Sequence, residues 1–375
     1  MSRTILCTGL GDIGEHWLHF IARIPGVGKI VACDLNPARA AVVDRVCWGA
    51  MHQGYYPDIE FRRIDLFDVE ATTELIKEVD PEAVFQNASV QSWWEMFTLP
   101  REVFLKLMPS VIGGWAMMHL STTYSLMKAV KAAGYYGKIP VVIATLPDIV
   151  APALAKVGLE PTCGGGNAQL RVPQIKRVVS RELGVPATAV EVWQVGEHAG
   201  IGTPEDPLPW WVKVEVNGED VTEELGGVEG LRRRLGRPYW DRETLPGPPP
   251  QQATAAAFLA NFIDVLFDNK RFVGTVPGVK GLIGGYPCRL GRRVELALPR
   301  EISLSEAIRI NEEAARKGDA VEEIKGDGTI VITDAAHRIL KEVFDFDHKE
   351  WGLEENVELA LDLNRRFRKF KASLL

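Results

Sequence analysis

The sequence predicts an α/β protein in which a doubly wound parallel sheet is followed by a mixed α+β domain. Strand-like and helical stretches alternate through residue 145, as in a parallel sheet with helices on both faces. A glycine-rich turn joins the first strand to the first helix. Asn217-Gly218 later marks a β-hairpin, and long helices follow it. We therefore expect residues 1–160 to form the first domain and residues 161–375 the second.

Composition and charge are those of an ordinary globular protein. The 375 residues are 46% hydrophobic and 25% charged, which suits about two domains. The net charge of −7 gives no overall positive field, so we expect neither nucleic acid nor a membrane as partner. No uncharged apolar run approaches the roughly 20 residues of a membrane span. The five cysteines form no C-x-x-C pair, so we expect reduced thiols, a cytoplasmic location and no metal site.

The first βαβ unit carries the pattern of a dinucleotide-binding site. Arg3–Thr8 is strand-like, Gly9–Gly14 has the spacing G-x-G-x-x-G, a helical pattern follows, and Lys29–Cys33 is a second strand ending at Asp34. The glycines permit a tight turn, let the backbone approach a pyrophosphate, and let the helix pack closely on the strand. The helix N-terminus favours phosphate charge, and the acid can bind the ribose. This is a Rossmann pattern that favours NAD, although nearby Arg39 leaves NADP open.

The carboxyl ends of the next strands extend this site. Ala83–Asn87 and Ile139–Thr145 are strand-like, and His119–Ala133 is helical between them. In a parallel doubly wound sheet these strand ends meet at one edge, where the cofactor lies. The residues that we expect to bind the cofactor are Gly9, Gly11, Asp12, Ile13, Gly14, Asp34, Asn87, Ala88 and Thr145.

The segment Ser92–Pro109 interrupts the alternation and is rich in aromatic residues. Trp93 and Trp94 directly follow a predicted strand end. An aromatic loop of this kind can cover an active site and exclude water. Core packing or a subunit contact explains the tryptophans equally well. Arg101 is a candidate to meet an anionic substrate.

The stretch Cys163–Gly200 has the residues for proton transfer. It reads as a glycine-rich turn, a helix ending at Leu183-Gly184-Val185, the strand Val190–Val195, and a glycine-flanked turn that holds His198. A histidine at a strand end is oriented and accessible, and it titrates near neutral pH. We therefore predict His198 to be the catalytic acid or base.

The order of these motifs resembles the lactate/malate dehydrogenase family over most of the chain. The resemblance rests on Asp34, Leu146-Pro147-Asp148, Gly166-Asn167 and Gly196-Glu197-His198. It implies that His198 exchanges a proton with a carbinol oxygen while hydride moves to or from the nicotinamide of NAD. It also implies that the helix beginning at Gln251 packs over the substrate, with Thr254 as a contact, and that the protein is a homodimer or homotetramer.

The helix after the glycine turn departs from the family pattern. That family pairs its histidine with an aspartate that lies three residues before a substrate-binding arginine. Cys163–Arg181 contains no Asp or Glu, so the carboxylate is missing or comes from elsewhere. Depending on the alignment, Arg171 or Gln174 takes the arginine position, and Asn167 and Gln169 remain to orient the imidazole. A threonine, Thr145, stands where the family has asparagine. We therefore expect a substrate other than plain lactate or malate.

These observations predict an NAD-dependent oxidoreductase that interconverts a secondary alcohol and a ketone of a small molecule. One alternative is an NAD-dependent glycosidase of family 4, which needs a metal near the glycine turn. A second alternative is an NAD-binding sensor without catalysis. The predicted catalytic residues are His198, Arg171 and Asn167. The predicted substrate contacts are Trp93, Arg101, Gln169, Gln174 and Thr254.

Overall fold

The structure is a computed structural model, described for residues 2–198, 200, 202, 206–235 and 251–374. The side chains of Trp93 and Asn167 lie outside this description. A six-stranded parallel sheet forms the N-terminal half, in the order β3-β2-β1-β4-β5-β6. The chain adds β2 and β3 on one side of β1 and then β4, β5 and β6 on the other side. The gap between β1 and β4 is therefore the switch point of the sheet, where dinucleotides bind in folds of this type. The strands are β1 Arg3–Thr8, β2 Val27–Asp34, β3 Asp58–Arg63, β4 Ala83–Gln86, β5 Val141–Ile143 and β6 Cys163–Gly164.

Helices cover this sheet, and their limits lie within a few residues of the predicted ones except in α4. Their amphipathic patterns bury one face against the strands. They are α1 Asp12–Ile21, α2 Ala40–Met51, α3 Val69–Val79, α4 Arg101–Ala132 and α5 Pro147–Ala155, with the short 3-10 helices η1 Pro37–Arg39 and η2 Trp93–Thr98.

Helix α4 corrects the prediction for the segment Ser92–Pro109. The helix was expected to begin at His119 but begins at Arg101 and runs for 32 residues, so this segment forms η2 and the first turns of α4. Pro109 lies inside the helix, where proline normally removes a hydrogen bond. Burial of the surrounding side chains outweighs this local cost. Among the described residues α4 alone is long and apolar enough to cross a membrane, and 72% of its most apolar stretch is buried in the protein.

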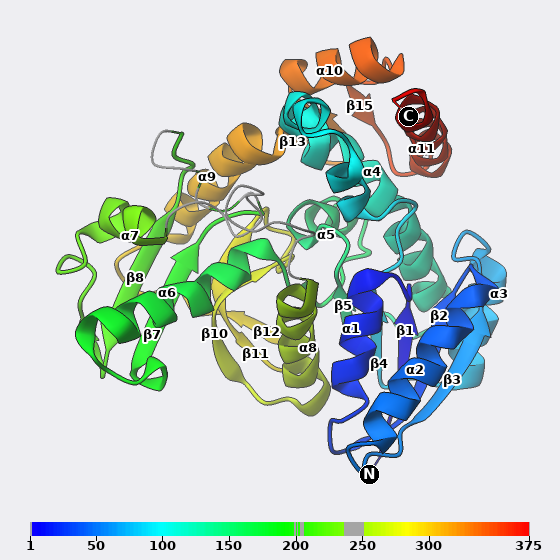
Figure 1. Cartoon of the computed structure of the whole chain (residues 1–375), viewed down its shortest axis with the longest axis horizontal. Helices are drawn as coiled ribbons and strands as arrows, with labels where there is room; N and C mark the ends of the chain where they lie inside the picture. The colour runs from blue at the N-terminus through cyan, green and yellow to red at the C-terminus, as the bar shows by residue number, and fades with distance from the viewer. Residues whose placement is uncertain (1, 199, 201, 203–205, 236–250, 375) are drawn as a thin grey trace.

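The described residues of the C-terminal half form three antiparallel sheets, each of three strands, with helices between them (Figure 1). The predicted hairpin at Asn217-Gly218 joins β8 to β9, and Asn217 has the left-handed backbone that this turn needs. The elements are α6 Asn167–Leu183, η3 Ala187–Ala189, β7 Val190–Val195, β8 Trp211–Val216, β9 Glu219–Asp220, α7 Gly227–Leu235, α8 Gln251–Phe267, β10 Arg271–Pro277, β11 Gly285–Leu290, β12 Val294–Leu296, α9 Leu304–Ala314, the π-helix η4 Ala315–Asp319, β13 Val321–Ile324, β14 Ile330–Ile332, α10 Asp334–Phe344, β15 Glu350–Trp351 and α11 Asn356–Ser373.

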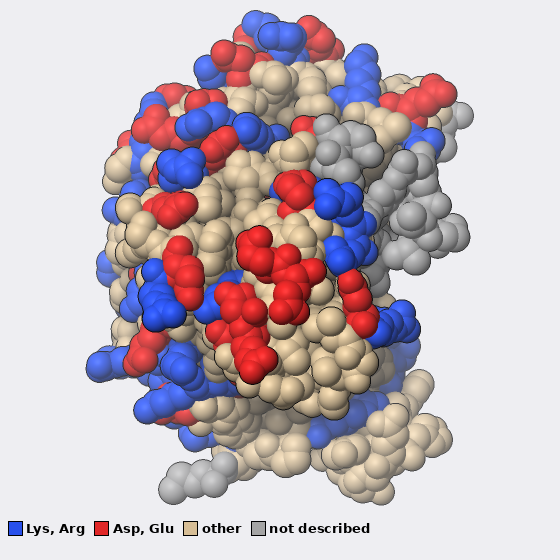
Figure 2. Space-filling view, turned by 90° about the vertical axis from the view of Figure 1, so that its left-hand side faces the viewer, with Lys and Arg blue, Asp and Glu red and all other residues tan. Residues whose placement is uncertain are grey.

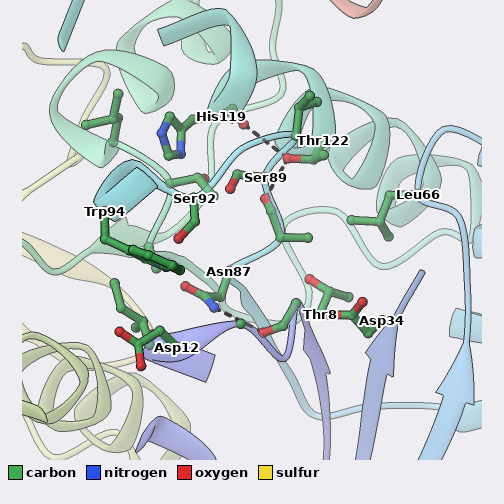
Figure 3. Close-up of a pocket in the computed structure, with 18 of the residues that line it drawn as sticks. Thr8, Asp12, Asp34, Leu66, Asn87, Ser89, Ser92, Trp94, His119 and Thr122 are labelled. Carbon is green, nitrogen blue, oxygen red and sulfur yellow. Dashed lines mark hydrogen bonds between the residues drawn. The ribbon is translucent and has the colours of Figure 1, made fainter. Parts of the chain in front are cut away.

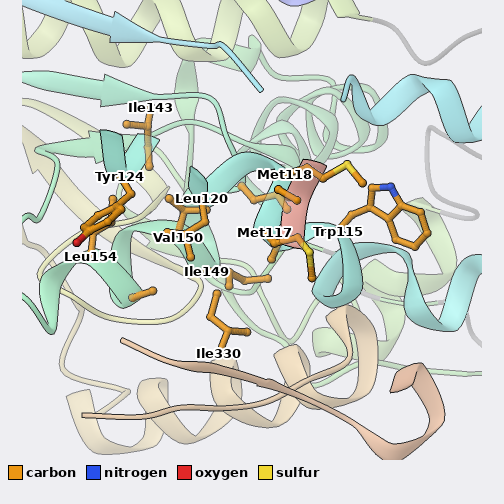
Figure 4. Packing of buried hydrophobic residues seen from close by; sticks show 14 of the residues in the cluster. Trp115, Met117, Met118, Leu120, Tyr124, Ile143, Ile149, Val150, Leu154 and Ile330 are labelled. Atoms are coloured by element: carbon orange, nitrogen blue, oxygen red, sulfur yellow. The ribbon is translucent and has the colours of Figure 1, made fainter. Parts of the chain in front are cut away.

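Two hydrophobic clusters connect the two halves of the chain. In the first, α1 packs against α8: Trp17 stacks on Phe85 with ring centroids 4.2 Å apart and meets Phe262 edge-on at 5.1 Å. In the second, α4 is surrounded by α5, α10, α11 and the sheet of β13 to β15 (Figure 4). The last segments of the chain thus pack on a helix of the N-terminal half. The division at residue 160 stays a prediction.

The surface carries both signs of charge. On the face formed by α6, α7 and β8, acidic side chains gather at the centre, and basic side chains surround them (Figure 2). Lys213 of β8 illustrates the pattern, since its ammonium group lies 2.9 Å from carboxylate oxygens of both Glu215 and Glu301. This mixture agrees with the modest net charge of −7.

Candidate active site

One cavity of about 700 Å³ runs from the carboxyl ends of the central strands to His198. Its walls come from both halves of the chain, as Figure 3 shows for the N-terminal part. Nearly all of the predicted cofactor contacts line it: Gly9, Gly11, Asp12, Ile13, Asp34, Asn87, Ala88 and Thr145. Gly14 lies behind them and is buried.

The glycine turn leaves room for a dinucleotide phosphate. Gly9 has φ +86°, and a Cβ there would come within 2.3 Å of the Ala88 backbone nitrogen. A Cβ at Gly14 would come within 2.1 Å of the Gly9 carbonyl oxygen. At Gly11, in contrast, nothing lies within 4 Å of the Cβ position, and this residue lines the cavity at the N-terminus of α1. The turn therefore has the open approach that a pyrophosphate requires.

Asp34 and Asn87 hold this turn in place. The two carboxylate oxygens of Asp34 accept hydrogen bonds from the backbone N–H groups of Leu10 and Asn36, each at 2.8 Å. The amide of Asn87 donates to the Gly9 carbonyl at 3.0 Å. Each Asp34 oxygen has capacity for a second hydrogen bond, and Asp34 lines the cavity, so a ribose hydroxyl can donate to it. These residues suit an adenine dinucleotide.

A buried polar network supports the next part of the cavity. The side-chain amide of Gln86 donates to the hydroxyls of Thr122 and Thr123 at 3.3 and 3.2 Å. Thr123 and Thr145 share a hydrogen bond of 2.6 Å, and Thr122 donates to the Ala88 carbonyl at 2.6 Å. These bonds tie α4 to the ends of β4 and β5, so the loop positions at 88 and 145 are fixed relative to each other.

His198 lies beyond the end of β7, on the C-terminal half of the chain. The Gly285 N–H donates to the Gly196 carbonyl at 2.7 Å, and the Gly200 N–H donates to the Glu197 carbonyl at 3.0 Å, so the turn is held on both sides. The residue His198 is 7% exposed and lines the cavity. Its Nδ1 lies 3.7 Å from a carboxylate oxygen of Asp319. The predicted histidine therefore has a carboxylate neighbour, supplied from elsewhere in the chain.

Asp319 ends the π-helix η4 and was not identified from the sequence. It is fully buried. Its approach to the site depends on Gly113 in the middle of α4, because a Cβ there would come within 2.7 Å of the Asp319 carbonyl oxygen. The adjacent glycines Gly113 and Gly114 inside a helix were the available signal, since such glycines mark close backbone contacts.

Two carboxylates determine the protonation of His198. Burial lowers the pKa of His198, but the neighbouring Asp319 carboxylate and the charge of Asp148 outweigh burial and raise it. Asp148 is itself 1% exposed, and burial is the main reason that its pKa rises to about 7, with the charge of Asp319 adding to the rise. The negative charge beside His198 therefore favours the imidazolium form of this histidine.

His119 on α4 is a second histidine that the sequence analysis missed as a site residue. It lines the same cavity and is 8% exposed, with its Nδ1 buried and without a hydrogen-bond partner among the described residues (Figure 3). Burial, and then the charge of His198, lower the pKa of His119 to about 4. This imidazole is therefore neutral at the pH where His198 holds a proton.

The other predicted substrate residues divide between the cavity and the interior. Thr254 lines the cavity, as does Trp94 beside the predicted Trp93. Arg171 is 1% exposed and donates to Gln174 at 2.9 Å, and neither residue lines the cavity. Substrate binding by Arg171 or Gln174 therefore stays a prediction, which the residues lining the cavity do not support.

Gln169 and Arg101 also lie away from the cavity lining. Gln169 exchanges two hydrogen bonds with the amide of Asn261, at 2.8 and 2.9 Å, and so joins α6 to α8. Arg101 is exposed at the start of α4, and Asn167 is the first residue of α6. Gln169 was expected to orient the imidazole of His198, but Asp319 lies beside this ring instead.

The C-terminal helix α11 adds a wall that the sequence analysis did not foresee. Leu361, Asn364 and Arg368 recur at helical spacing and line the cavity. The helix is attached to the segment after β4, since Asn364 donates to the Val90 carbonyl at 3.5 Å and Lys371 pairs with Glu95 at 2.7 Å. The sequence did not indicate this cavity wall, because residues that recur at helical spacing also form ordinary packing faces.

The sheet order is that of a doubly wound α/β protein with a cavity at its switch point, and comparisons with known structures specify the fold. No family model matches the sequence, and no curated protein matches it. The chain is similar to lactate dehydrogenase from Cryptosporidium parvum, solved with lactic acid and β-nicotinamide adenine dinucleotide, with a TM-score of 0.60 and 18% identity over 85% of this chain and 96% of that one.

Two further structures show the same similarity. Malate dehydrogenase from Picrophilus torridus matches with a TM-score of 0.59 and 18% identity over 98% of this chain and 100% of that one. Minor L-lactate dehydrogenase from Enterococcus mundtii matches with a TM-score of 0.58 and 14% identity, over 84% and 96% of the two chains. The chain therefore has the fold of lactate and malate dehydrogenases, as the sequence predicted.

Proposed function

We propose that the protein is an NAD-dependent oxidoreductase that interconverts a secondary alcohol and a ketone, with His198 as the acid and base. The observation that supports this most is the pairing of His198 with Asp319 at the end of a cavity whose other end has a dinucleotide-binding turn. The structural neighbours titled as lactate and malate dehydrogenases, some with NAD or NADH bound, support the same chemistry. When bound, the nicotinamide ring would supply the hydride donor or acceptor.

The protein's own residues would handle the proton. In ketone reduction, protonated His198 donates to the carbonyl oxygen, and in alcohol oxidation neutral His198 accepts the hydroxyl proton. Asp319 lies beside Nδ1, so it would hold the proton on that nitrogen and leave Nε2 for the substrate. Asp319 and Asp148 would also stabilise the imidazolium that forms when the alcohol is oxidised.

The remaining assignments follow from the same proposal. Asp34, Asn87 and the glycine turn would bind NAD, with residues 1–160 as the cofactor domain and residues 161–375 as the domain that carries His198. Asp34 favours NAD over NADP because its carboxylate repels a 2′-phosphate. A homodimer or homotetramer in the cytoplasm is the expected assembly and location.

The variant His198→Gln tests the proposal. Reduction of a panel of small ketones would be followed through NADH consumption, and NADH binding through its fluorescence. We expect kcat/KM to fall at least about 100-fold, because positioned acid–base groups contribute about 10²- to 10⁴-fold. NADH affinity should stay within about threefold, since His198 follows β7 and is no part of the dinucleotide turn.

The exposed residue His52 provides the matched control, since His52→Gln removes a histidine outside the cavity. Retention of more than about one tenth of the wild-type turnover in His198→Gln would refute the role of His198. NADH binding without turnover of any ketone or alcohol would favour the sensor alternative. Manganese-dependent glycoside cleavage without net NADH formation would favour the glycosidase.

A further inference from the structure

Four neutral polar side chains in the cavity have hydrogen-bonding capacity that the protein does not use. They are Ser92, His119, Gln251 and Thr254, all of which line the cavity. His119, Gln251 and Thr254 are each 8% exposed. Among the described residues none of the four side chains has a hydrogen-bond or ion-pair partner. Buried polar atoms are normally paired, and among the described residues the buried Nδ1 of His119 has no partner, so His119 in particular indicates a ligand that pairs with it.

His119 is the most informative member of this group. Its ring projects from α4 into the space near Ser92 (Figure 3), while its own backbone carbonyl accepts from Thr123 at 2.9 Å. The ring is neutral over the ordinary pH range, because burial and the charge of His198 lower its pKa to about 4. A neutral imidazole donates with one nitrogen and accepts with the other. A hydroxyl group, which also donates and accepts, is the matching partner.

The two histidines therefore offer different contacts to one ligand. His198, with its two carboxylate neighbours, presents a proton donor to the reacting oxygen. His119 presents a neutral group of the kind that binds a hydroxyl. Ser92, Gln251 and Thr254 add further neutral partners, and Trp94, Met108 and Ile112 add apolar surface. The lining around the histidines thus suits an uncharged, hydroxyl-bearing molecule.

We propose that the substrate is an uncharged polyol or hydroxy ketone, and that His119 binds a second hydroxyl close to the carbon whose oxygen faces His198. This inference rests on the proposed function, because it assigns the substrate class of the same site. The cations that line the described cavity are Arg39, five residues after Asp34, and Arg368 on α11. A carboxylate substrate held by Arg368 is the competing arrangement, and the experiment includes it.

Binding to the NADH-loaded protein tests the proposal without requiring turnover. Histidine labelled with ¹³C would report the ring resonances of His119 and His198 by NMR during titration with butan-2-ol, butane-2,3-diol or lactate. We expect butane-2,3-diol to bind about tenfold tighter than butan-2-ol, because it adds one paired hydroxyl to an otherwise similar molecule, and to shift both resonances. Lactate should bind more weakly than the diol.

Variants separate a substrate contact from a structural role. His119→Phe should remove the preference for the diol and leave butan-2-ol affinity within about threefold, whereas His119→Gln should keep part of the preference because an amide also donates and accepts. His52→Phe is the matched control and should change neither. If His119→Phe fails to fold, His119→Gln and the wild-type affinity order still decide the question.

Three results would overturn the proposal: equal affinity for diol and monoalcohol in the wild type, tighter binding of lactate than of diol, or an unchanged His119 resonance on diol binding. A different result would refute the proposed function. If the diol binds as expected but NAD⁺ and the diol yield no NADH, the oxidoreductase assignment is refuted while the hydroxyl-binding site stands.

Discussion

The end of β7 and the middle of α4 each place a histidine in one cavity, in opposite electrostatic surroundings. His198 at the end of β7 has Asp319 3.7 Å away and Asp148 close enough to raise its pKa. His119 in α4 has no carboxylate among the causes of its shift, and burial, followed by the charge of His198, lowers its pKa to about 4. Both side chains are less than 10% exposed. Burial is therefore common to the two sites, and the nearby carboxylates decide which histidine carries a proton.

The comparison teaches that the two histidines suit different tasks. A group whose charged form is stabilised can deliver and recover a proton near neutral pH, whereas a group held neutral can only form hydrogen bonds there. Removing the carboxylates should make His198 resemble His119. The predictions below follow that reasoning, beginning with the largest effect.

Asp319→Asn should have the largest effect, with kcat/KM for ketone reduction about 100-fold lower. The carboxamide cannot stabilise the imidazolium, so the pKa of His198 should fall. Reduction needs protonated His198, and the loss of activity as pH rises should therefore occur at lower pH in the variant. A pH profile of kcat/KM measures both changes.

The control for this variant is Asp58→Asn, which replaces an exposed aspartate at the start of β3. It should leave the profile unchanged. An Asp319→Asn profile that falls in amplitude without moving along the pH axis would show that Asp319 orients the ring but does not set its charge.

His119→Gln should change how stability depends on pH. The unfolded protein binds a proton on His119 near pH 6.5, whereas the folded protein does so only near pH 4, so this residue makes the native state less stable as pH falls. Protonation of His119 in the unfolded state lowers the free energy of unfolding by about 2 kcal/mol between pH 7 and pH 5. Urea unfolding at both pH values should therefore show a loss on acidification that is about 2 kcal/mol smaller in the variant than in the wild type.

His52→Gln should reproduce the wild-type loss, since this histidine is exposed. An identical loss in the wild type and in His119→Gln would mean that His119 titrates normally. The contrast between the two cavity histidines would then disappear.

Asp148→Asn should have the smallest effect on activity, with kcat/KM within about tenfold of wild type, since its charge ranks below that of Asp319 in raising the pKa of His198. The same substitution should raise the stability of the protein, although it lowers the activity. Burial raises the pKa of Asp148 to about 7, so the folded protein resists ionising it and loses stability as pH rises from about 4 to 7. The variant should therefore unfold at a higher temperature than wild type at pH 8, and by a smaller margin at pH 5. An activity loss larger than that of Asp319→Asn would reverse the assigned order.

The cofactor end of the cavity could be predicted from sequence because its signals are local. The turn Gly9–Gly14 and the acid Asp34 lie within one βαβ unit, and Gly9 and Gly14 stand where a Cβ would meet the backbone. The turn that holds His198 was predictable for the same reason, since strand and turn are adjacent in the sequence. The catalytic role of His198 stays a prediction. The start of α4 was predicted wrongly because Pro109 and two tryptophans suggested a loop, whereas tertiary burial stabilises a helix there.

Asp319 and His119 were harder to predict as neighbours of His198 because the three residues meet only in three dimensions. Asp319 lies 121 positions after His198, and His119 lies 79 positions before it. Nothing in the local pattern of either segment indicates a shared cavity. The wall formed by Leu361, Asn364 and Arg368 depends likewise on how α11 packs against α4.

The short π-helix η4 makes the position of Asp319 sensitive to chain length. Ala315–Asp319 forms a wider turn than an α-helix, and Ala320 then leaves it with φ +60°. Each residue of an α-helix advances the side-chain direction by about 100°. Loss of one residue from this turn would rotate Asp319 away from His198 while leaving α9 and β13 intact. A single-codon deletion or insertion could thus remove or create the carboxylate partner, which gives evolution a short path between catalytic and non-catalytic versions of this fold.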